Sequence, residues 1–207
     1  MISRFHYITQ DIPGYSHTEL AEIACKNGVQ WVQLRLKEVN YDLWLKTASE
    51  TLEICKKYNA RLIINDNVEV ALKINADGVH LGAGDMSPEK ARKILGYGPI
   101  IGATANTMDD IERLSQLEID YIGLGPFRFT STKKNLSPVL GMEGLKKIST
   151  SLKHNVPLVA IGGIKPEDVE EILSTGVHGI AVSSAINMAE DKGKVIKAFL
   201  DKLNIKN

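Results

Sequence analysis

Short apolar runs alternate with amphipathic segments along the whole chain. The first apolar run, residues 5–9, is followed by helical periodicity over residues 16–27 and by a second apolar run over residues 31–35. Further apolar runs predict strands at residues 61–65, 78–81, 99–104, 121–125, 157–161 and 179–183. Further amphipathic segments predict helices at residues 41–58, 68–74, 88–95, 108–117, 142–152, 166–174 and 192–203.

This pattern consists of eight strand–helix units in one chain. Such units close into a (β/α)8 barrel or form an open, doubly wound sheet. An open sheet usually carries its glycine fingerprint after the first strand, whereas here the pair Gly162–Gly163 follows the seventh. Ser87 before Pro88 is a typical helix start and agrees with this phase. The sequence therefore predicts an α/β protein with a single TIM-barrel domain over residues 1–207.

Composition and charge exclude several classes of partner. The chain is 43% hydrophobic and 24% charged, and 25 basic residues balance 25 acidic ones. No long-range field would therefore gather nucleic acid or an acidic membrane. Residues 1–10 do not resemble a signal peptide, and no apolar run approaches the ~20 residues that span a bilayer. Cys25 and Cys55 lie in predicted helices without metal-ligand spacing. We expect a cytoplasmic protein with small-molecule partners, and the sequence leaves the formation of a homo-oligomer open.

Polar and apolar residues alternate along the second predicted strand and its extension. The polar positions are Gln33, Arg35 and Lys37, and the apolar positions are Val32, Leu34 and Leu36. Because successive strand side chains point to opposite faces, the polar set would enter the barrel. Two cations inside it need an anion or an internal layer of salt bridges. A solvated edge strand would also alternate, but a closed barrel has no edge. We interpret Arg35 and Lys37 as a clamp for a phosphate or diphosphate.

Two carboxylates follow the third and fourth predicted strands. Asp66 comes directly after the third strand, and Asp85 lies in the loop after the fourth. The active site of a TIM barrel lies at the carboxyl ends of its strands, so both side chains would lie on the same rim. This pair suits Mg²⁺, which commonly uses one or two protein carboxylates together with water and phosphate oxygens. The alternative for Asp66 is a helix N-cap. His80, inside the fourth strand, is more typical of a hydrogen-bonded core histidine than of a ligand.

Three later loops offer groups that bind anions. The connection over residues 126–141 contains Thr130, Ser131, Thr132 and Lys133. Gly162–Gly163 and Ser183–Ser184 follow the seventh and eighth strands, the usual position of a barrel phosphate site. The alternatives are a polar surface loop without a role and a turn that merely needs glycine. Two anion sites in one mouth indicate two phosphorylated substrates that are joined with loss of one phosphate group.

Five rim segments, in the same order along the chain, resemble the thiamine-phosphate synthase (thiamine-phosphate pyrophosphorylase) family. They are residues 32–37 (Val-Gln-Leu-Arg-Leu-Lys), 64–68 (Ile-Asn-Asp-Asn-Val), 76–82 (Ala-Asp-Gly-Val-His-Leu-Gly) with Asp85, 123–126 (Gly-Leu-Gly-Pro) with 130–134 (Thr-Ser-Thr-Lys-Lys), and 161–164 (Ile-Gly-Gly-Ile). The resemblance implies a TIM-barrel transferase in thiamine biosynthesis. Its reaction would couple 4-amino-5-hydroxymethyl-2-methylpyrimidine diphosphate to a thiazole phosphate, or to its carboxylated form, and release thiamine phosphate and pyrophosphate.

The resemblance also implies a role for each matching residue. The pyrimidine diphosphate would be bound by Gln33, Arg35, Lys37, Asn65, Thr104 and Lys133, and Leu34 and Leu36 would be further substrate-binding residues. The thiazole phosphate would be bound by Thr130, Ser131, Thr132, Gly163, Ser183 and Ser184. Mg²⁺ would be bound by Asp66 and Asp85. In the implied dissociative mechanism, Arg35, Lys37 and Lys133 are catalytic because they stabilise the departing pyrophosphate, and no side-chain nucleophile is required.

Two positions of this chain depart from the pattern of the thiamine-phosphate synthase family. Thr104 stands where many members have serine, and Ser183 occupies a position that is often aliphatic.

A thiazole tautomerase would resemble this chain but looks to carry a catalytic histidine at the position of Pro126. A non-catalytic thiamine-phosphate sensor is the other alternative. Neither rival needs both Asp66 and Asp85.

Overall fold

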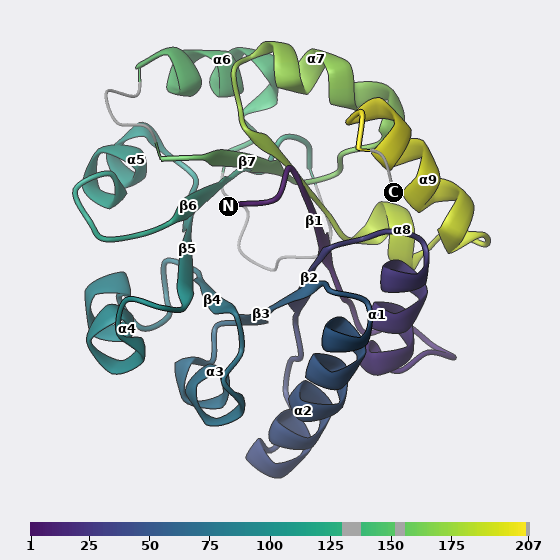
Figure 1. Cartoon of the computed structure of the whole chain (residues 1–207). Coiled ribbons are helices and arrows are strands. Elements are labelled where there is room, and N and C mark those ends of the chain that lie inside the picture. Colours follow the sequence, from purple (N-terminus) through teal and green to yellow (C-terminus); the bar gives the residue numbers. More distant parts are fainter. Residues whose placement is uncertain (130–137, 152–155, 206–207) are drawn as a thin grey trace.

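The computed structural model describes residues 1–129, 138–151 and 156–205, and these form a closed parallel barrel surrounded by helices (Figure 1). The strands follow one another around the barrel in chain order. They are β1 (Phe5–Ile8), β2 (Trp31–Leu34), β3 (Arg61–Asn65), β4 (Gly78–Leu81), β5 (Ile100–Ala105), β6 (Tyr121–Leu124), β7 (Leu158–Ile161) and β8 (Gly179–Val182). The barrel closes where β1 pairs in parallel with β8, with Phe5 opposite Ile180. The predicted TIM barrel is confirmed.

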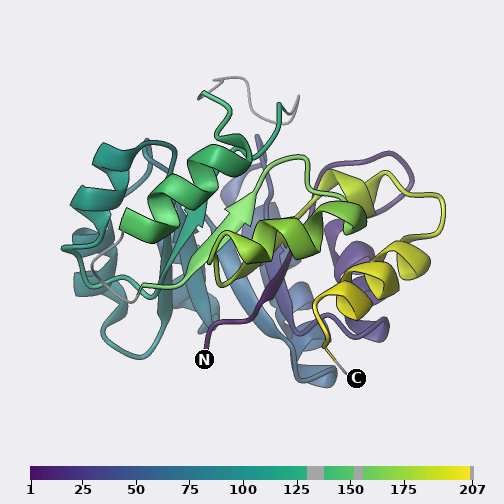
Figure 2. The same cartoon turned by 90° about the horizontal axis from the view of Figure 1, so that it is seen from above.

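Helices connect successive strands and cover the outside of the barrel (Figure 2). They are α1 (His17–Lys26), α2 (Tyr41–Lys57), α3 (Val68–Ile74), α4 (Pro88–Leu95), α5 (Met108–Leu114), α6 (Gly141–Ser151), the 3₁₀ turn η1 (Pro166–Asp168), α7 (Val169–Ser174), α8 (Ser184–Asn187) and α9 (Lys192–Lys202). No helix in the described ranges is long and apolar enough to cross a membrane.

Side-chain caps explain where several of these helices begin. Ser16 forms a capping box with Glu19 at the start of α1. Ser87 accepts a hydrogen bond from the Lys90 N–H and is followed by proline at the first helical position, as the sequence predicts. These caps satisfy amide groups that have no partner inside the helix, so the helix boundaries are set locally.

The structure differs from the predicted elements in three places. The second strand ends at Leu34, so Arg35 and Lys37 belong to the β2–α2 loop. The predicted helix over 166–174 begins as a 3₁₀ turn and becomes α-helical at Val169. The short helix α8 was not predicted, because four residues are too few to show helical periodicity.

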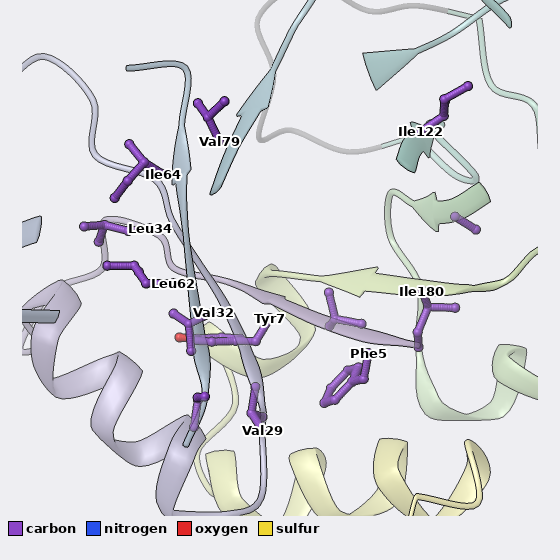
Figure 3. Close-up of a cluster of buried hydrophobic side chains, with 14 of the residues drawn as sticks. Phe5, Tyr7, Val29, Val32, Leu34, Leu62, Ile64, Val79, Ile122 and Ile180 are labelled. Carbon is purple, nitrogen blue, oxygen red and sulfur yellow. The ribbon is translucent and has the colours of Figure 1, made fainter. Parts of the chain in front are cut away.

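The apolar side chains form an outer and an inner layer. In the outer layer, side chains from alternate strand positions point away from the barrel axis and pack against the helices (Figure 3). The inner layer fills the barrel below its mouth with Ile8, Trp31, Ile63, Tyr121, Val159 and Ala181. This inner layer forms the floor on which the polar residues of the mouth rest, as is usual for a packed barrel interior.

His6 lies within the inner layer as a buried, neutral imidazole. Its ring stacks on Trp31 with 4.2 Å between centroids, and its Nε2 lies 3.0 Å from the Ser3 carbonyl oxygen. Burial, with a smaller contribution from His80, lowers the pKa of His6 from 6.5 to about 3.

This low pKa predicts a loss of stability in mild acid. The unfolded chain takes up the His6 proton first as the pH falls, so the stabilisation is complete above pH 6.5 and is lost progressively towards pH 3. As the pH falls, the free energy of unfolding should decrease more steeply in the wild type than in His6→Phe. We expect the difference between the two slopes to reach ~1.4 kcal/mol per pH unit. Urea titrations between about pH 4.5 and 6.5 measure this difference. Parallel pH profiles of the two proteins would contradict it.

Candidate active site

The barrel mouth is hollowed into a cavity of about 540 Å³ at the carboxyl ends of the strands. Most of the predicted site residues that the structure describes line it. These are Gln33, Arg35, Lys37, Asn65, Asp66, Asp85, Thr104, Gly163, Ser183 and Ser184. Residues predicted from separate parts of the sequence are therefore brought together in one place, as expected for a TIM barrel.

Four predicted residues lie outside the described ranges, and two others point away from the cavity. The first group is Thr130, Ser131, Thr132 and Lys133. Leu34 and Leu36 are buried in the outer apolar layer and are not among the residues that line the cavity. Their side chains support the β2–α2 segment rather than forming the cavity wall.

The amide side chains of Gln33 and Asn65 form a fixed pair on neighbouring strands. Gln33 Nε2 donates to Asn65 Oδ1 at 2.7 Å, and both residues are buried. The bond leaves Gln33 Oε1 as an acceptor and the Asn65 amide as a donor beside the cavity. This pair can therefore read the hydrogen-bonding pattern of a heterocycle or bind a phosphate oxygen.

Arg35 is half-buried and lies between carboxylates. Burial lowers its pKa, while the nearby charges of Asp66 and Asp11 oppose that shift. Its backbone N–H donates to Thr9 Oγ1 at 3.0 Å. Thr9 Oγ1 also lies 2.7 Å from His17 Nδ1, and Asp11 lies 3.0 Å from His17 Nε2. The end of β1 thus fixes the position of the loop that carries the clamp.

Thr9, His17 and Asp11 are hydrogen-bonded in a hydroxyl–imidazole–carboxylate chain like that of a hydrolytic triad. Unlike the nucleophile of such a triad, the hydroxyl is not accessible. The Thr9 side chain is fully buried, and its hydroxyl accepts the Arg35 N–H. A nucleophilic hydroxyl needs access to the reacting atom. We therefore interpret these three residues as a support for the β2–α2 loop.

Asp66 and Asp85 share one side of the mouth. Burial is the largest cause that raises the pKa of Asp66, to about 7, and the neighbouring Asp85 adds to it through a hydrogen bond and its charge. Lys37 and Arg35 act in the opposite direction. A carboxylate pair in this state is stabilised by a bound cation.

The helix-capping alternative for Asp66 is wrong. The N-cap of α3 is Asn67, whose Oδ1 accepts the Val70 N–H at 3.0 Å. Asp66 itself has a left-handed backbone, with φ 65°, and donates its N–H to the His80 carbonyl at 2.9 Å. Asp85 accepts the Gly82 N–H at 2.7 Å in its own loop. Neither carboxylate caps a helix, so both remain available at the rim.

The donor set fits Mg²⁺ better than a metal that prefers nitrogen or sulfur ligands. Two carboxylates are present, and the described ranges contain no group of three or more histidine, cysteine or acidic residues that could hold a metal. Mg²⁺ keeps several waters and takes further oxygens from a substrate phosphate. Arg35 and Lys37 lie beside the same carboxylates, where such a phosphate would be bound.

His80 connects two other residues at the base of the cavity. His80 Nε2 lies 2.9 Å from Thr104 Oγ1, and Nδ1 lies 2.9 Å from the Tyr121 hydroxyl. Both ring nitrogens are hydrogen-bonded, as expected for a core histidine, but His80 is half-buried and lines the cavity. The sequence analysis did not predict that His80 lines the cavity, although its position in β4 directs its side chain into the barrel. The hydroxyl of Thr104 is therefore held in place by a partly buried network.

The turns after β7 and β8 present backbone to the cavity. Gly162 and Gly163 have φ values of 110° and 65°, which favour glycine. The Ser183 hydroxyl donates to Gln10 Oε1 at 3.3 Å and lies 3.2 Å from Asn187 Nδ2. Because this hydroxyl is engaged in the wall, Ser183 offers mainly its backbone to a ligand. A serine in place of an aliphatic residue at position 183 should therefore have little effect on ligand binding.

The fold and the mouth define a TIM-barrel protein with a polar cavity at its C-terminal rim, where barrel enzymes have their active sites and where carboxylates, cations and glycine turns meet here. The family model described as thiamine monophosphate synthase matches residues 5–186, and the chain belongs to this family.

Relatives and solved structures agree over nearly the full chain. A thiamine-phosphate synthase of Bacteroides fragilis is 46% identical over 198 residues, which cover 94% of this chain and 97% of the relative. One of Flavobacterium psychrophilum is 44% identical, and the match covers 98% of this chain and 100% of the relative. The structure of a thiamine phosphate pyrophosphorylase from Pyrococcus furiosus has a TM-score of 0.87 and 33% identity, covering 97% of this chain and 95% of that one.

Proposed function

We propose that this protein is a thiamine-phosphate synthase. It would couple 4-amino-5-hydroxymethyl-2-methylpyrimidine diphosphate with a thiazole phosphate, plain or carboxylated, and release thiamine phosphate and pyrophosphate. The observation that carries the proposal is the meeting of Asp66, Asp85, Arg35 and Lys37 on one side of the mouth. The family and the relatives support the same assignment.

The diphosphate end of the pyrimidine substrate would be bound between the β2–α2 and β3–α3 segments. Arg35 offers a planar fork to its oxygens and Lys37 a point charge. Lys133, outside the described ranges, would add a third cation. Asp66 and Asp85 would hold Mg²⁺, which when bound supplies positive charge against the departing pyrophosphate. These cations would stabilise the charge that develops as the bond to the pyrimidine methylene breaks.

The pyrimidine ring would lie deeper, over the inner layer. Gln33, Asn65 and Thr104 present hydrogen-bonding groups there, and His80 fixes the Thr104 hydroxyl. An electron-rich aminopyrimidine supports a methylene cation, which the thiazole nitrogen would capture. The buried state of Thr9 supports a mechanism without a protein nucleophile.

The rival functions account for fewer of the observed residues. A tautomerase would need a histidine at the position that Pro126 occupies in the cavity wall. A passive sensor would gain nothing from two carboxylates that crowd each other in the absence of a cation. The shared carboxylate site therefore favours a metal-assisted transferase over both.

The substrates are small phosphorylated molecules, and we place the enzyme in the cytoplasm. Cys25 and Cys55 are free and buried, which supports a reducing compartment.

Growth of a synthase-deficient bacterium tests the proposal. A strain that lacks its own thiamine-phosphate synthase should grow without added thiamine when it expresses this chain. The chain with both Asp66→Ala and Asp85→Ala should not restore growth at the same level of soluble protein. Absence of growth with soluble wild-type protein would count against the assignment.

A further inference from the structure

A bidentate ion pair joins the segment after β6 to the segment after β7. Arg128 donates from Nη1 and Nη2 to the two carboxylate oxygens of Asp168, each at 2.5 Å. Asp168 is only 7% exposed and also accepts the Lys165 N–H at 2.8 Å. The Arg128 guanidinium lies over the Phe127 ring, 4.7 Å from its centroid. With both oxygens bound and one partner buried, this pair is more rigid than an ordinary surface salt bridge.

Arg128 also binds two consecutive carbonyls of the turn after β7. Its backbone N–H donates to the Gly162 carbonyl at 3.0 Å, and its Nη1 donates to the Gly163 carbonyl at 2.9 Å. A trans peptide unit points its C=O and its N–H in opposite directions. The two bonds therefore direct the N–H groups of Gly163 and Ile164 away from Arg128.

These two N–H groups face the side of the turn on which the cavity lies. Gly163 and Ile164 line the cavity, whereas Arg128 does not. Neither N–H has a backbone acceptor within the residues that the structure describes. Successive amide groups in a turn of this kind form a concave binding site for an anion.

The turn is also pressed against the segment that carries Arg128. A Cβ added at Gly162 would lie 2.8 Å from Pro126 Cα and 2.9 Å from the Phe127 nitrogen. The turn thus has little freedom to shift by itself, and the Arg128 side chain adds a direct hydrogen bond to its Gly163 carbonyl.

We propose that Arg128 is a positioning residue for the thiazole phosphate. It does not contact the phosphate but, paired with Asp168, fixes the two amide groups that bind it. This inference rests on the proposed function, in which the second anion site holds the thiazole phosphate. Arg128 then sets the affinity for this substrate and not for the pyrimidine diphosphate, whose cations in the described ranges, Arg35 and Lys37, belong to the β2–α2 loop.

The test compares Arg128→Lys with Arg92→Lys. Lysine keeps the charge but cannot bridge a carboxylate and a carbonyl as a planar fork does. Arg92 is a matched control at the other end of the barrel, where it donates to Asp120 at 2.8 Å and to the Pro99 carbonyl at 2.8 Å. Both variants lose guanidinium hydrogen bonds to a carboxylate and to a backbone carbonyl. Only Arg128→Lys loses them next to a turn that lines the cavity.

In Arg128→Lys, we expect the KM for thiazole phosphate to rise about ten-fold, the effect of one weakened hydrogen bond to a charged group. The KM for the pyrimidine diphosphate should stay unchanged within error, and Arg92→Lys should change neither KM. Equal rises of both KM values in Arg128→Lys, or no rise in either, would overturn the inference.

A binding measurement separates this inference from the proposed function. Inorganic phosphate should raise the melting temperature of the wild type and of Arg92→Lys more than that of Arg128→Lys. If the wild type shows this protection but no turnover, the proposed function fails while the role of Arg128 stands. Equal protection of all three proteins would overturn the role of Arg128.

Discussion

Asp66→Asn should lower kcat/KM for the coupling reaction by about 10²- to 10³-fold, since metal and charge stabilisation of a departing pyrophosphate contribute several kcal/mol. The same change should not lower the melting temperature measured without Mg²⁺. Asparagine tolerates the left-handed backbone at this position, where φ is 65°. It also removes one of two carboxylates that crowd each other, as the raised pKa of Asp66 indicates. The variant should therefore lose activity, whereas its melting temperature should stay the same or rise.

Kinetics at several Mg²⁺ concentrations, together with thermal unfolding, measure both effects. Asp120→Asn is the control, because Asp120 accepts bonds from Arg92 and from the Ile101 N–H at the opposite end of the barrel. It should lower the melting temperature and leave the Mg²⁺ dependence as in the wild type. Asp66→Asn with normal turnover and normal Mg²⁺ dependence would be inconsistent with a metal site at Asp66.

Gly102→Ala should be among the most destabilising single substitutions in the barrel. An added Cβ would lie 2.1 Å from Tyr121 Cζ and 2.6 Å from its hydroxyl oxygen. The Tyr121 ring is 1% exposed and packs edge-on against His6 and Trp31, so a shift of the ring would break these contacts. We expect a loss of about 3 kcal/mol in the free energy of unfolding, at the upper end for overpacking a core.

Urea unfolding of Gly102→Ala and Gly98→Ala measures this effect. Gly98 has open space around its added Cβ, so its variant should differ from the wild type by less than ~1 kcal/mol. Gly102→Ala should also lower activity, because Tyr121 holds His80 and thereby Thr104. Equal stabilities of the two variants would show that the inner layer is more adaptable than its packing indicates.

The order of strands and helices could be predicted from the sequence because each unit carries its own periodicity and caps. The limits of prediction lie where a residue's role depends on distant parts of the chain. The alternation around Arg35 predicted a strand, but β2 ends at Leu34 because the Arg35 N–H bonds to the Thr9 side chain. Arg35 and Lys37 nevertheless line the cavity at the barrel mouth.

The candidate site was predicted where strand ends carry charged side chains. Asp66 and Asp85 could be placed on one rim from topology alone. Their mutual effect on pKa depends on burial and distance, which the sequence does not contain. The role of His80 follows from its bond to Tyr121, which is 41 residues away. The Arg128–Asp168 pair spans 40 residues and likewise has no local signal.

A pyrophosphate-release assay with the purified protein tests the central claim most directly. Both substrates are supplied with Mg²⁺, each is then omitted in turn, and the complete mixture is repeated with excess EDTA. The account predicts pyrophosphate and thiamine phosphate in equal amounts, only when both substrates and Mg²⁺ are present. No release from folded protein, or release that persists in EDTA, would contradict a metal-assisted coupling in this barrel mouth.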